Sequence, residues 1–199
     1  MTVDKIPAGV FQANCYIVKE GHDVVIIDPG AYRKVSLCLS LEEDDKVRAI
    51  LLTHGHFDHI GGVDRLQKDF GCPVYLSKED EELARSERIN SMGPYSCVLH
   101  CALKDFTSGM MRFGNLAAEV LYTPGHTEGS VCFKIGNHLF TGDTLFHRSV
   151  GRTDLYGGSD TKLRQSLRML SALDPNLILH PGHEEDSTLE EELKHNPYL

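Results

Sequence analysis

A nearly continuous apolar run at residues 47–52 leads directly into a segment with three histidines and one aspartate within six residues. Such a run is typical of a strand buried on both faces, which delivers the following residues at its carboxyl end. Alternate residues of an extended chain point the same way, so His54 and His56 can bind one ion. Asp58 and His59 follow at the turn and can face a second ion. Because imidazole and carboxylate suit zinc, and imidazole also suits iron, the segment predicts a metal site rather than a histidine-rich surface loop.

Three further side chains of the same kinds occur later, each in a turn after a predicted strand. His126 stands in Thr-Pro-Gly-His-Thr, Asp143 in Thr-Gly-Asp-Thr and His183 in Pro-Gly-His. A lone histidine is more often structural or solvated. Here, however, the order H-x-H-x-D-H, followed by H, D and H, resembles the metallo-β-lactamase superfamily. The resemblance extends from Asn14 to the C-terminus.

The resemblance implies two divalent metal ions that share one carboxylate, that of Asp143. The first ion would have three imidazole ligands: His54, His56 and His126. The second would have two imidazoles and a carboxylate: Asp58, His59 and His183. Zinc is the expected metal, and the same ligands accept iron or manganese. Gly61 and Gly62 are expected to let the backbone turn tightly beside this cluster.

Two divalent ions that share Asp143 can hold a hydroxide, because metal coordination lowers the pKa of water from about 15.7 toward about 7. One ion can also polarise a carbonyl, and Asp58 is expected to act in catalysis by helping to position the water. This chemistry hydrolyses an acyl or phosphoryl bond without a serine or cysteine nucleophile. The sequence therefore predicts a metal-dependent hydrolase.

Two later segments resemble one branch of the superfamily, the glyoxalase II-like proteins. They are the run 142–146 with the loop 149–155, and the terminal Asn-Pro-Tyr-Leu at 196–199. Proteins of this branch are thioester hydrolases, and the type case cleaves S-lactoylglutathione. The chain departs from full-length glyoxalase II, whose C-terminal helical extension supplies much of the glutathione site, because only a short segment follows His183. The resemblance thus implies a small-molecule thioester substrate, with glutathione as the thiol left open.

Several alternatives remain at this point. Persulfide dioxygenases share the fold and use one iron with two histidines and one aspartate, which would be His54, His126 and Asp143 here. A lactonase would use the same hydroxide on a ring ester. A β-lactamase fits the Gly-Arg-Thr-Asp loop less well, and a metal-binding domain without activity would not need all seven ligands. Arg152 could orient a substrate or anchor its loop, and the anchoring role is the expected one because Asp154 is available as a local partner.

Composition and charge narrow the other possibilities. The 199 residues suffice for one well-buried core, so a single domain over residues 1–199 is expected. A net charge of −9 argues against nucleic acid as a partner. We expect no membrane span, because the chain has no apolar stretch of about 18 residues. The N-terminus lacks the shape of a signal peptide, and six scattered cysteines favour reduced thiols, so the expected location is the cytoplasm. The oligomeric state is left open.

The pattern along the chain predicts strands, then interrupting helices, then strands again. Strands are expected at residues 10–18, 24–28, 47–52, 74–76, 117–122, 131–135, 138–141 and 177–179. Helices are expected at residues 32–41, 60–70, 79–85 and 161–173, with a last one opened by a capping box of Ser187 and Glu190. Residues 86–104 form either a mobile flap near the site or a connecting loop. The resemblance implies an α/β fold, the αββα sandwich of two packed mixed sheets with helices on the outer faces.

Overall fold

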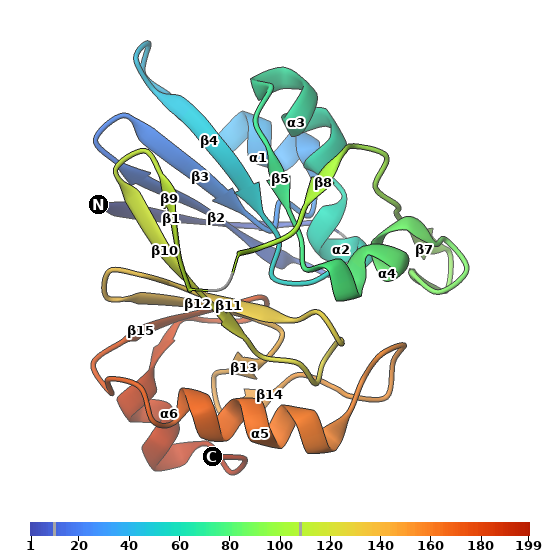
Figure 1. Ribbon diagram of the computed structural model, residues 1–199, viewed down its shortest axis with the longest axis vertical. Coiled ribbons are helices and arrows are strands. Elements are labelled where there is room, and N and C mark those ends of the chain that lie inside the picture. The colour runs from blue at the N-terminus through green and yellow to red at the C-terminus, as the bar shows by residue number, and fades with distance from the viewer. Residues whose placement is uncertain (10, 108) are drawn as a thin grey trace.

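Two six-stranded sheets lie face to face in the computed structural model, which describes residues 1–9, 11–107 and 109–199 (Figure 1). The first sheet has the order β1-β2-β3-β4-β5-β8. Its strands are β1 (Thr2–Ala8), β2 (Ala13–Glu20), β3 (Asp23–Ile27), β4 (Lys46–Leu51), β5 (Val74–Tyr75) and β8 (Leu103–Lys104). Strands β1, β2 and β3 pair antiparallel, whereas β3, β4, β5 and β8 pair parallel, so the sheet is mixed.

The second sheet has the order β16-β15-β12-β11-β10-β9. Its strands are β9 (Gly109–Phe113), β10 (Leu116–Tyr122), β11 (Val131–Ile135), β12 (His138–Gly142), β15 (Ile178–Pro181) and β16 (Ser187–Thr188). Only β12 and β15 pair parallel, so this sheet is mixed as well. Two small hairpins lie outside the sheets: β6 (Ser91–Met92) with β7 (Tyr95–Ser96), and β13 (Leu145–Phe146) with β14 (Ser149–Val150).

Helices cover the outer face of each sheet (Figure 1). On the side of the first sheet lie α1 (Tyr32–Cys38), α2 (Phe57–Ile60), α3 (Val63–Phe70), the 3-10 turn η1 (Lys78–Asp80) and α4 (Glu81–Arg85). On the side of the second sheet lie α5 (Asp160–Leu170) and α6 (Leu189–His195). The helix-sheet-sheet-helix order confirms the predicted αββα sandwich.

The alternating residues of the central strands divide between two cores. In β3, Ile26 packs toward the helices of the first sheet, whereas Val25 packs between the sheets. In β4, Ile50 and Leu51 divide in the same way, and both are fully buried. The predicted burial on both faces is therefore confirmed for residues 49–52, because a strand of period 2 can fill two cores only when layers lie on both sides. It is wrong for the start of the run, where Arg48 is exposed and Val47 is only partly buried.

The helix expected at residues 60–70 is in fact two helices, α2 and α3. Gly61 and Gly62 separate them, but both have negative φ angles, so the expected turn does not depend on glycine's conformational freedom. The close approach of another backbone segment is what requires glycine. A Cβ on Gly61 would collide with the carbonyl oxygen of Gly30, and Gly62 N donates to Pro29 O at 2.7 Å.

Other element predictions need correction. Strands β1 and β9 were not expected from the pattern, and the strand expected at residues 10–18 begins at Ala13, with residue 10 outside the described residues. The helix expected at 32–41 ends at Cys38, and that expected at 161–173 ends at Leu170. The last helix is capped one residue later than predicted, because Thr188 Oγ1 accepts the hydrogen bond from Glu191 N.

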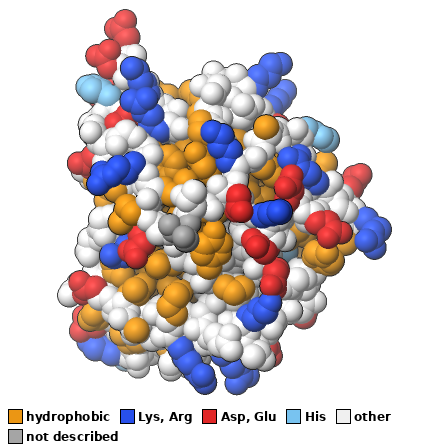
Figure 2. Space-filling model, in the orientation of Figure 1, with side chains coloured by type: hydrophobic (Ala, Val, Ile, Leu, Met, Phe, Trp, Pro, Cys, Tyr) orange, Lys and Arg blue, Asp and Glu red, His pale blue; other side chains and the backbone are white. Residues whose placement is uncertain are grey.

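The surface shows no single dominant sign of charge on the face drawn in Figure 2, where acidic and basic side chains stand next to one another. Each of the six cysteines is a free thiol. Across the described residues, we find no helix with the length and apolar character that a bilayer span requires.

Candidate metal centre

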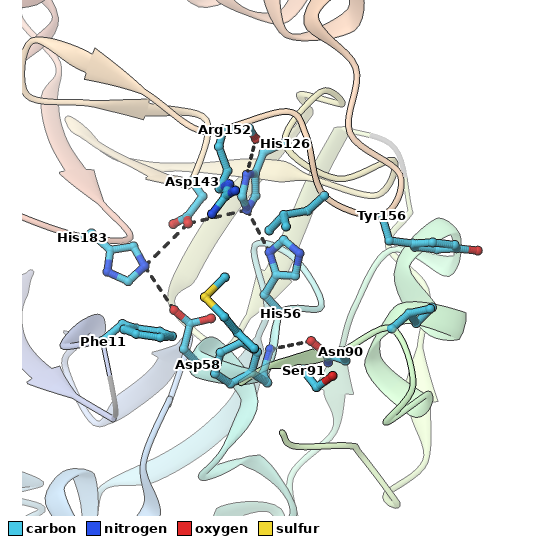
Figure 3. Close-up of a pocket in the computed structure, with 14 residues that line it drawn as sticks. Phe11, His56, Asp58, Asn90, Ser91, His126, Asp143, Arg152, Tyr156 and His183 are labelled. Carbon is cyan, nitrogen blue, oxygen red and sulfur yellow. Dashed lines mark hydrogen bonds and ion pairs between the residues drawn. The ribbon is translucent and has the colours of Figure 1, made fainter. Parts of the chain in front are cut away.

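The seven predicted ligands meet where strands of both sheets end, and Figure 3 shows five of them around one pocket. The segment His54–His59 follows β4, and α2 begins within it, so Asp58 and His59 stand on a short helix. His126, Asp143 and His183 follow β10, β12 and β15, respectively. Strand ends of both sheets therefore bring together residues that are far apart in the chain.

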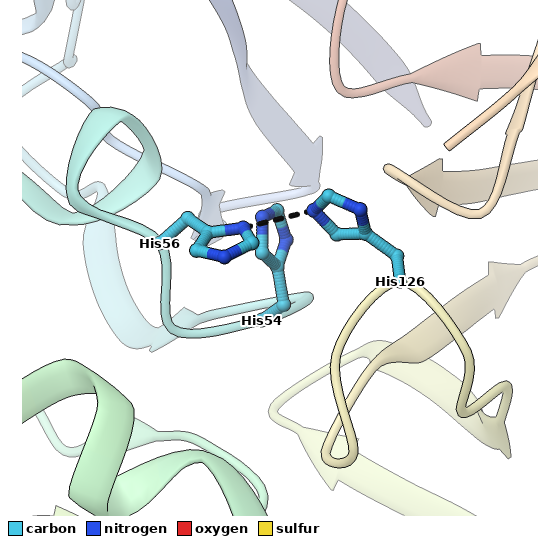
Figure 4. Close-up of side chains that lie close together, drawn as sticks. All are labelled: His54, His56 and His126. Atoms are coloured by element: carbon cyan, nitrogen blue, oxygen red, sulfur yellow. Dashed lines mark hydrogen bonds between the residues drawn. The ribbon is translucent and has the colours of Figure 1, made fainter. Parts of the chain in front are cut away.

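Three imidazoles form the first group (Figure 4). Ligand atoms of His54, His56 and His126 all lie within 4.8 Å of one another. His56 Nδ1 is 2.8 Å from His126 Nε2. Burial lowers the pKa of His54 well below its usual value and lowers the pKa of His56 to about 3. Neutral imidazole is the form that binds metal, so these rings need not lose a proton to act as ligands.

Two imidazoles and a carboxylate form the second group. His183 Nε2 lies 3.3 Å from Asp58 Oδ2 and 3.3 Å from His59 Nε2. Burial acts to lower the pKa of His59, but the carboxylates of Asp143 and Asp58 outweigh it and raise this pKa. The pKa of His183 is raised in the same way, by its hydrogen bond to Asp58 and the charge of Asp143.

The carboxylate of Asp143 lies between the two groups. Its Oδ2 is 3.6 Å from both His126 Nε2 and His183 Nε2, and its Oδ1 is 3.4 Å from His59 Nε2. A Cβ on Gly182 would collide with Asp143 Oδ1, so only glycine fits beside this carboxylate. The position is the one that a bridging ligand would occupy.

Two buried polar atoms in this cluster lack a hydrogen-bond partner among the described residues: His54 Nε2 and Asp143 Oδ1. An unsatisfied buried polar group is costly, so such atoms indicate a missing partner. Both atoms belong to side chains that suit a divalent metal. The donor set of the cluster therefore fits a dinuclear metal site.

Asp28 orients part of this cluster and was not singled out from the sequence as a site residue. Its Oδ2 lies 3.1 Å from His59 Nδ1 and accepts a hydrogen bond from Thr53 Oγ1 at 2.5 Å, while Oδ1 accepts from Thr53 N at 2.8 Å. Thr53 Oγ1 lies 3.0 Å from His54 Nδ1. Such outer partners hold the ring orientation of metal-binding histidines. The available signal was an aspartate directly after a strand, before Pro29 and Gly30.

Asp80 is a second partner that sequence reasoning missed. This buried carboxylate accepts hydrogen bonds from Gly55 N at 2.8 Å, Gly129 N at 2.7 Å and Thr127 Oγ1 at 2.7 Å. It thereby ties the loop of His54 and His56 to the loop of His126. Burial raises the pKa of Asp80, although the hydrogen bonds act in the opposite direction.

The contacts of Arg152 are those of a residue that anchors its loop. His126 Nδ1 donates to the carbonyl oxygen of Arg152 at 2.8 Å, which leaves Nε2 facing the cluster. The guanidinium makes two hydrogen bonds to Asp154, at 2.6 and 2.7 Å. His147, which matches no ligand position, lies 2.5 Å from Glu185 through its Nδ1.

A cavity of about 270 Å³ opens above the cluster. His56, Asp58, His126, Asp143 and His183 line its floor, and the rest of the lining is mostly apolar: Phe11, Phe57, Ile89, Met92, Leu155 and Tyr156, with Asn90, Ser91 and Arg152. Residues 86–104, which the sequence did not assign, thus contribute a wall of the pocket. Their mobility stays a prediction.

The wall is fastened to the ligand loop by Asn90. Its Nδ2 donates to Gly55 O at 2.8 Å and to Cys97 O at 3.2 Å, and its Oδ1 accepts from Phe57 N at 2.8 Å. Asn90 is almost fully buried. The β6–β7 hairpin that carries Met92 is therefore tied at its base to the segment that carries His54 and His56.

Comparison with known proteins agrees with this geometry. The model of the metallo-beta-lactamase superfamily matches residues 8–183. The hydroxyacylglutathione hydrolase GloC of Haemophilus influenzae is 30% identical over 100% of this chain and 98% of its own. The crystal structure of BLEG-1 B3 metallo-beta-lactamase is 34% identical, with a TM-score of 0.91 over 100% of this chain and 99% of that one. The crystal structure of TTHA1623 in a di-iron-bound form is 37% identical, with a TM-score of 0.86 over 99% of this chain and 100% of that one. Because the family model matches most of its length, the chain belongs to the metallo-β-lactamase superfamily.

Proposed function

We propose that this protein is a metal-dependent hydrolase that cleaves a small-molecule thioester. The observation that carries the proposal is the carboxylate of Asp143, which faces an all-imidazole group on one side and the group of Asp58, His59 and His183 on the other. This cluster forms the floor of a cavity that a small substrate can enter. The similarity to a hydroxyacylglutathione hydrolase supports a thioester as the substrate class.

The ligand roles follow from the two groups. We assign the first metal to the three imidazoles of His54, His56 and His126. We assign the second metal to Asp58, His59 and His183, and we assign Asp143 as the ligand shared by both metals. When bound, two divalent ions supply an acidified water and a Lewis acid for the thioester carbonyl. Zinc is the proposed metal, with iron as the alternative that the di-iron-bound neighbour supports.

The side chains of this chain then have separate tasks. Asp58 lines the cavity and can accept a hydrogen bond from the attacking water. This hydrogen bond orients a lone pair of the water oxygen toward the thioester carbonyl. Attack forms a carbon–oxygen bond and breaks the carbon–sulfur bond, and the sulfur leaves with a proton as the thiol. Ser130 and Cys132, close to His126 in sequence, are buried and are not needed as nucleophiles.

Metal analysis and hydrolysis assays on one sample test this proposal. The protein is purified without added metal, and a panel is offered: S-lactoylglutathione, uncharged acyl thioesters, a lactone and a cephalosporin. We expect two metals per chain and thioester turnover that a chelator removes and added zinc restores. A protein with two metals per chain that turns over the lactone or the cephalosporin but no thioester would overturn it.

A persulfide dioxygenase is the second candidate, because its three ligands are contained in the same cluster. His126 Nε2 lies 3.6 Å from Asp143 Oδ2, and His54 lies beside His126. A single iron per chain, with oxygen uptake on a persulfide and no thioester turnover, would favour this candidate over hydrolysis.

A further inference from the structure

A second groove adjoins the metal-site cavity, so that the cluster lies at a junction of two arms. Both are bordered by Phe11, Arg152 and the ligands His126, Asp143 and His183. The first arm continues along Ile89, Met92, Leu155 and Tyr156, and the second along Gln12, Phe146, Val150 and Glu184. A thioester with its carbonyl at the cluster must send its acyl half and its thiol half into different arms.

The first arm presents apolar surface. Figure 3 shows Phe11 and Tyr156 on opposite sides of the pocket, with the Tyr156 hydroxyl directed away from the ligands. That hydroxyl donates to Glu82 Oε2 at 3.0 Å, so the ring rather than the polar tip faces the cavity. The amide of Asn90 is already occupied by backbone groups. The polar groups of Tyr156 and Asn90 are thus used elsewhere, and among the described residues Ser91 is the one lining side chain of this wall with a hydroxyl left for the cavity. The mostly apolar wall suits an apolar acyl group.

The described residues that line the second arm offer no free cation for an anionic thiol. Among the described lining residues of both arms, Arg152 is the only lysine or arginine, and Asp154 holds its guanidinium with two hydrogen bonds. Glu184, which also lines this arm, adds a negative charge. The two carboxylates of glutathione would meet this charge without a compensating partner, and like charges in juxtaposition disfavour binding.

We propose that the preferred substrates are thioesters of an apolar acyl group with an uncharged thiol, and that thioesters of glutathione are disfavoured. The acyl group occupies the arm of Met92 and Tyr156, and the thiol occupies the arm of Gln12 and Glu184. Water adds to the carbonyl carbon, the carbon–sulfur bond breaks, and the products are a carboxylic acid and a neutral thiol. This assignment rests on the proposed thioester hydrolysis.

A matched substrate series tests the assignment. Lactoyl, butyryl, hexanoyl and octanoyl thioesters of N-acetylcysteamine and of glutathione are compared on the metal-loaded protein. We expect kcat/KM to rise about threefold to fourfold per methylene until the arm is filled. We also expect at least about a tenfold preference for N-acetylcysteamine at equal acyl length. A preference for glutathione, or no dependence on chain length, would overturn the assignment.

Binding of unreactive analogues separates this inference from the proposed activity. S-hexyl-N-acetylcysteamine and S-hexylglutathione are thioethers that cannot be hydrolysed, and calorimetry gives their affinities for the metal-loaded protein. Tighter binding of the uncharged thioether supports the assignment even if no thioester is turned over, in which case the proposed hydrolysis alone fails. Tighter binding of S-hexylglutathione contradicts it whatever the turnover.

Two substitutions locate the effect in the named arms. Met92→Ala should weaken the chain-length dependence, whereas Met169→Ala should not, because Met169 is equally exposed on α5 but does not line either arm. Glu184→Gln should raise activity on the glutathione series about threefold or more relative to N-acetylcysteamine, and Glu190→Gln, outside both arms, should not. Unchanged ratios in Glu184→Gln would show that this charge does not discriminate.

Discussion

The floor and the rim of the same cavity are built in different ways. The floor consists of predicted ligands that follow β4, β10, β12 and β15, and two of them, His56 and His126, are only 7% and 3% exposed. Hydrogen bonds that the carboxylates of Asp28 and Asp80 accept hold this part in place. The rim consists of Phe11, Met92 and Tyr156, which are exposed by 42%, 37% and 47%.

This difference separates the chemistry from the choice of substrate. Residues at strand ends inherit the rigidity of two sheets, so the groups that hold metals keep a defined geometry. Residues on loops and on a small hairpin can change without disturbing the sheets, so substrate preference is set where the backbone is least constrained. Substitutions in the floor should therefore alter metal content, and substitutions in the rim should alter KM alone.

The largest effect is expected for Asp143→Ala, which removes the carboxylate between the two ligand groups. Loss of an outer partner of a ligand costs about 10- to 100-fold in affinity or activity, so loss of this ligand should cost at least about a hundredfold. Metal analysis should show fewer ions per chain, and hydrolysis should fall accordingly. Asp44→Ala, at an exposed turn, is the control. Full activity in Asp143→Ala would contradict a dinuclear centre.

The next effect is expected for Asp28→Asn, which keeps the shape of the side chain but removes its charge. Asn also tolerates the positive φ of 49° found at this position. Because His59 and Thr53 would lose a charged acceptor, metal affinity should fall about 10- to 100-fold with the fold retained. Titration with zinc measures the affinity, and circular dichroism checks the fold. Wild-type affinity would mean that Asp28 does not support the ligands.

A smaller effect, confined to the rim, is expected for Phe11→Ala. The Phe11 ring packs edge to face with Phe57 and Tyr95, at centroid distances of 5.8 and 6.0 Å. These pairs hold the ring at the rim. Loss of the apolar surface that the ring offers the acyl chain, at about 0.8 kcal/mol per buried CH₂, should raise KM for a hexanoyl thioester about threefold to tenfold. Metal content should stay at the wild-type value. A loss of metal would show that Phe11 helps to hold the metal-site residues, and it would contradict the separation of metal binding from substrate preference.

The smallest effect is expected for His147→Ala. His147 contacts Glu185 and lies outside the lining of the cavity. Metal content and kcat/KM should remain within about twofold of the wild type, as for an exposed ion pair of little energetic weight. A large loss of metal in this variant would show that the ligand assignment is wrong.

The sequence predicted the fold and the cluster because both leave local patterns. The apolar run at residues 47–52 marks a strand buried on both faces, and the histidine spacing after it carries the family resemblance. Asp28, Asp80 and Asn90 leave no such pattern, since the hydrogen bonds that join each of them to the segment 53–57 connect residues at least 25 positions apart. The capping residue of α6 was missed by one position because Ser187 with Glu190 and Thr188 with Glu191 both have the spacing of a capping box.

By itself, the sequence determined which side chains are candidates for metal binding, their order and the layered α/β architecture, since side-chain chemistry and hydrophobic periodicity are properties of the chain. The tertiary structure decided which side chains face one another. Only the packing of the two sheets sets Asp143 between His59 and His126. Only the fold brings Ile89 and Met92 of residues 86–104 to the same cavity as Phe11, Leu155 and Tyr156. Such contacts join residues that are distant in the chain, and their geometry depends on strand order and register, which no local pattern encodes.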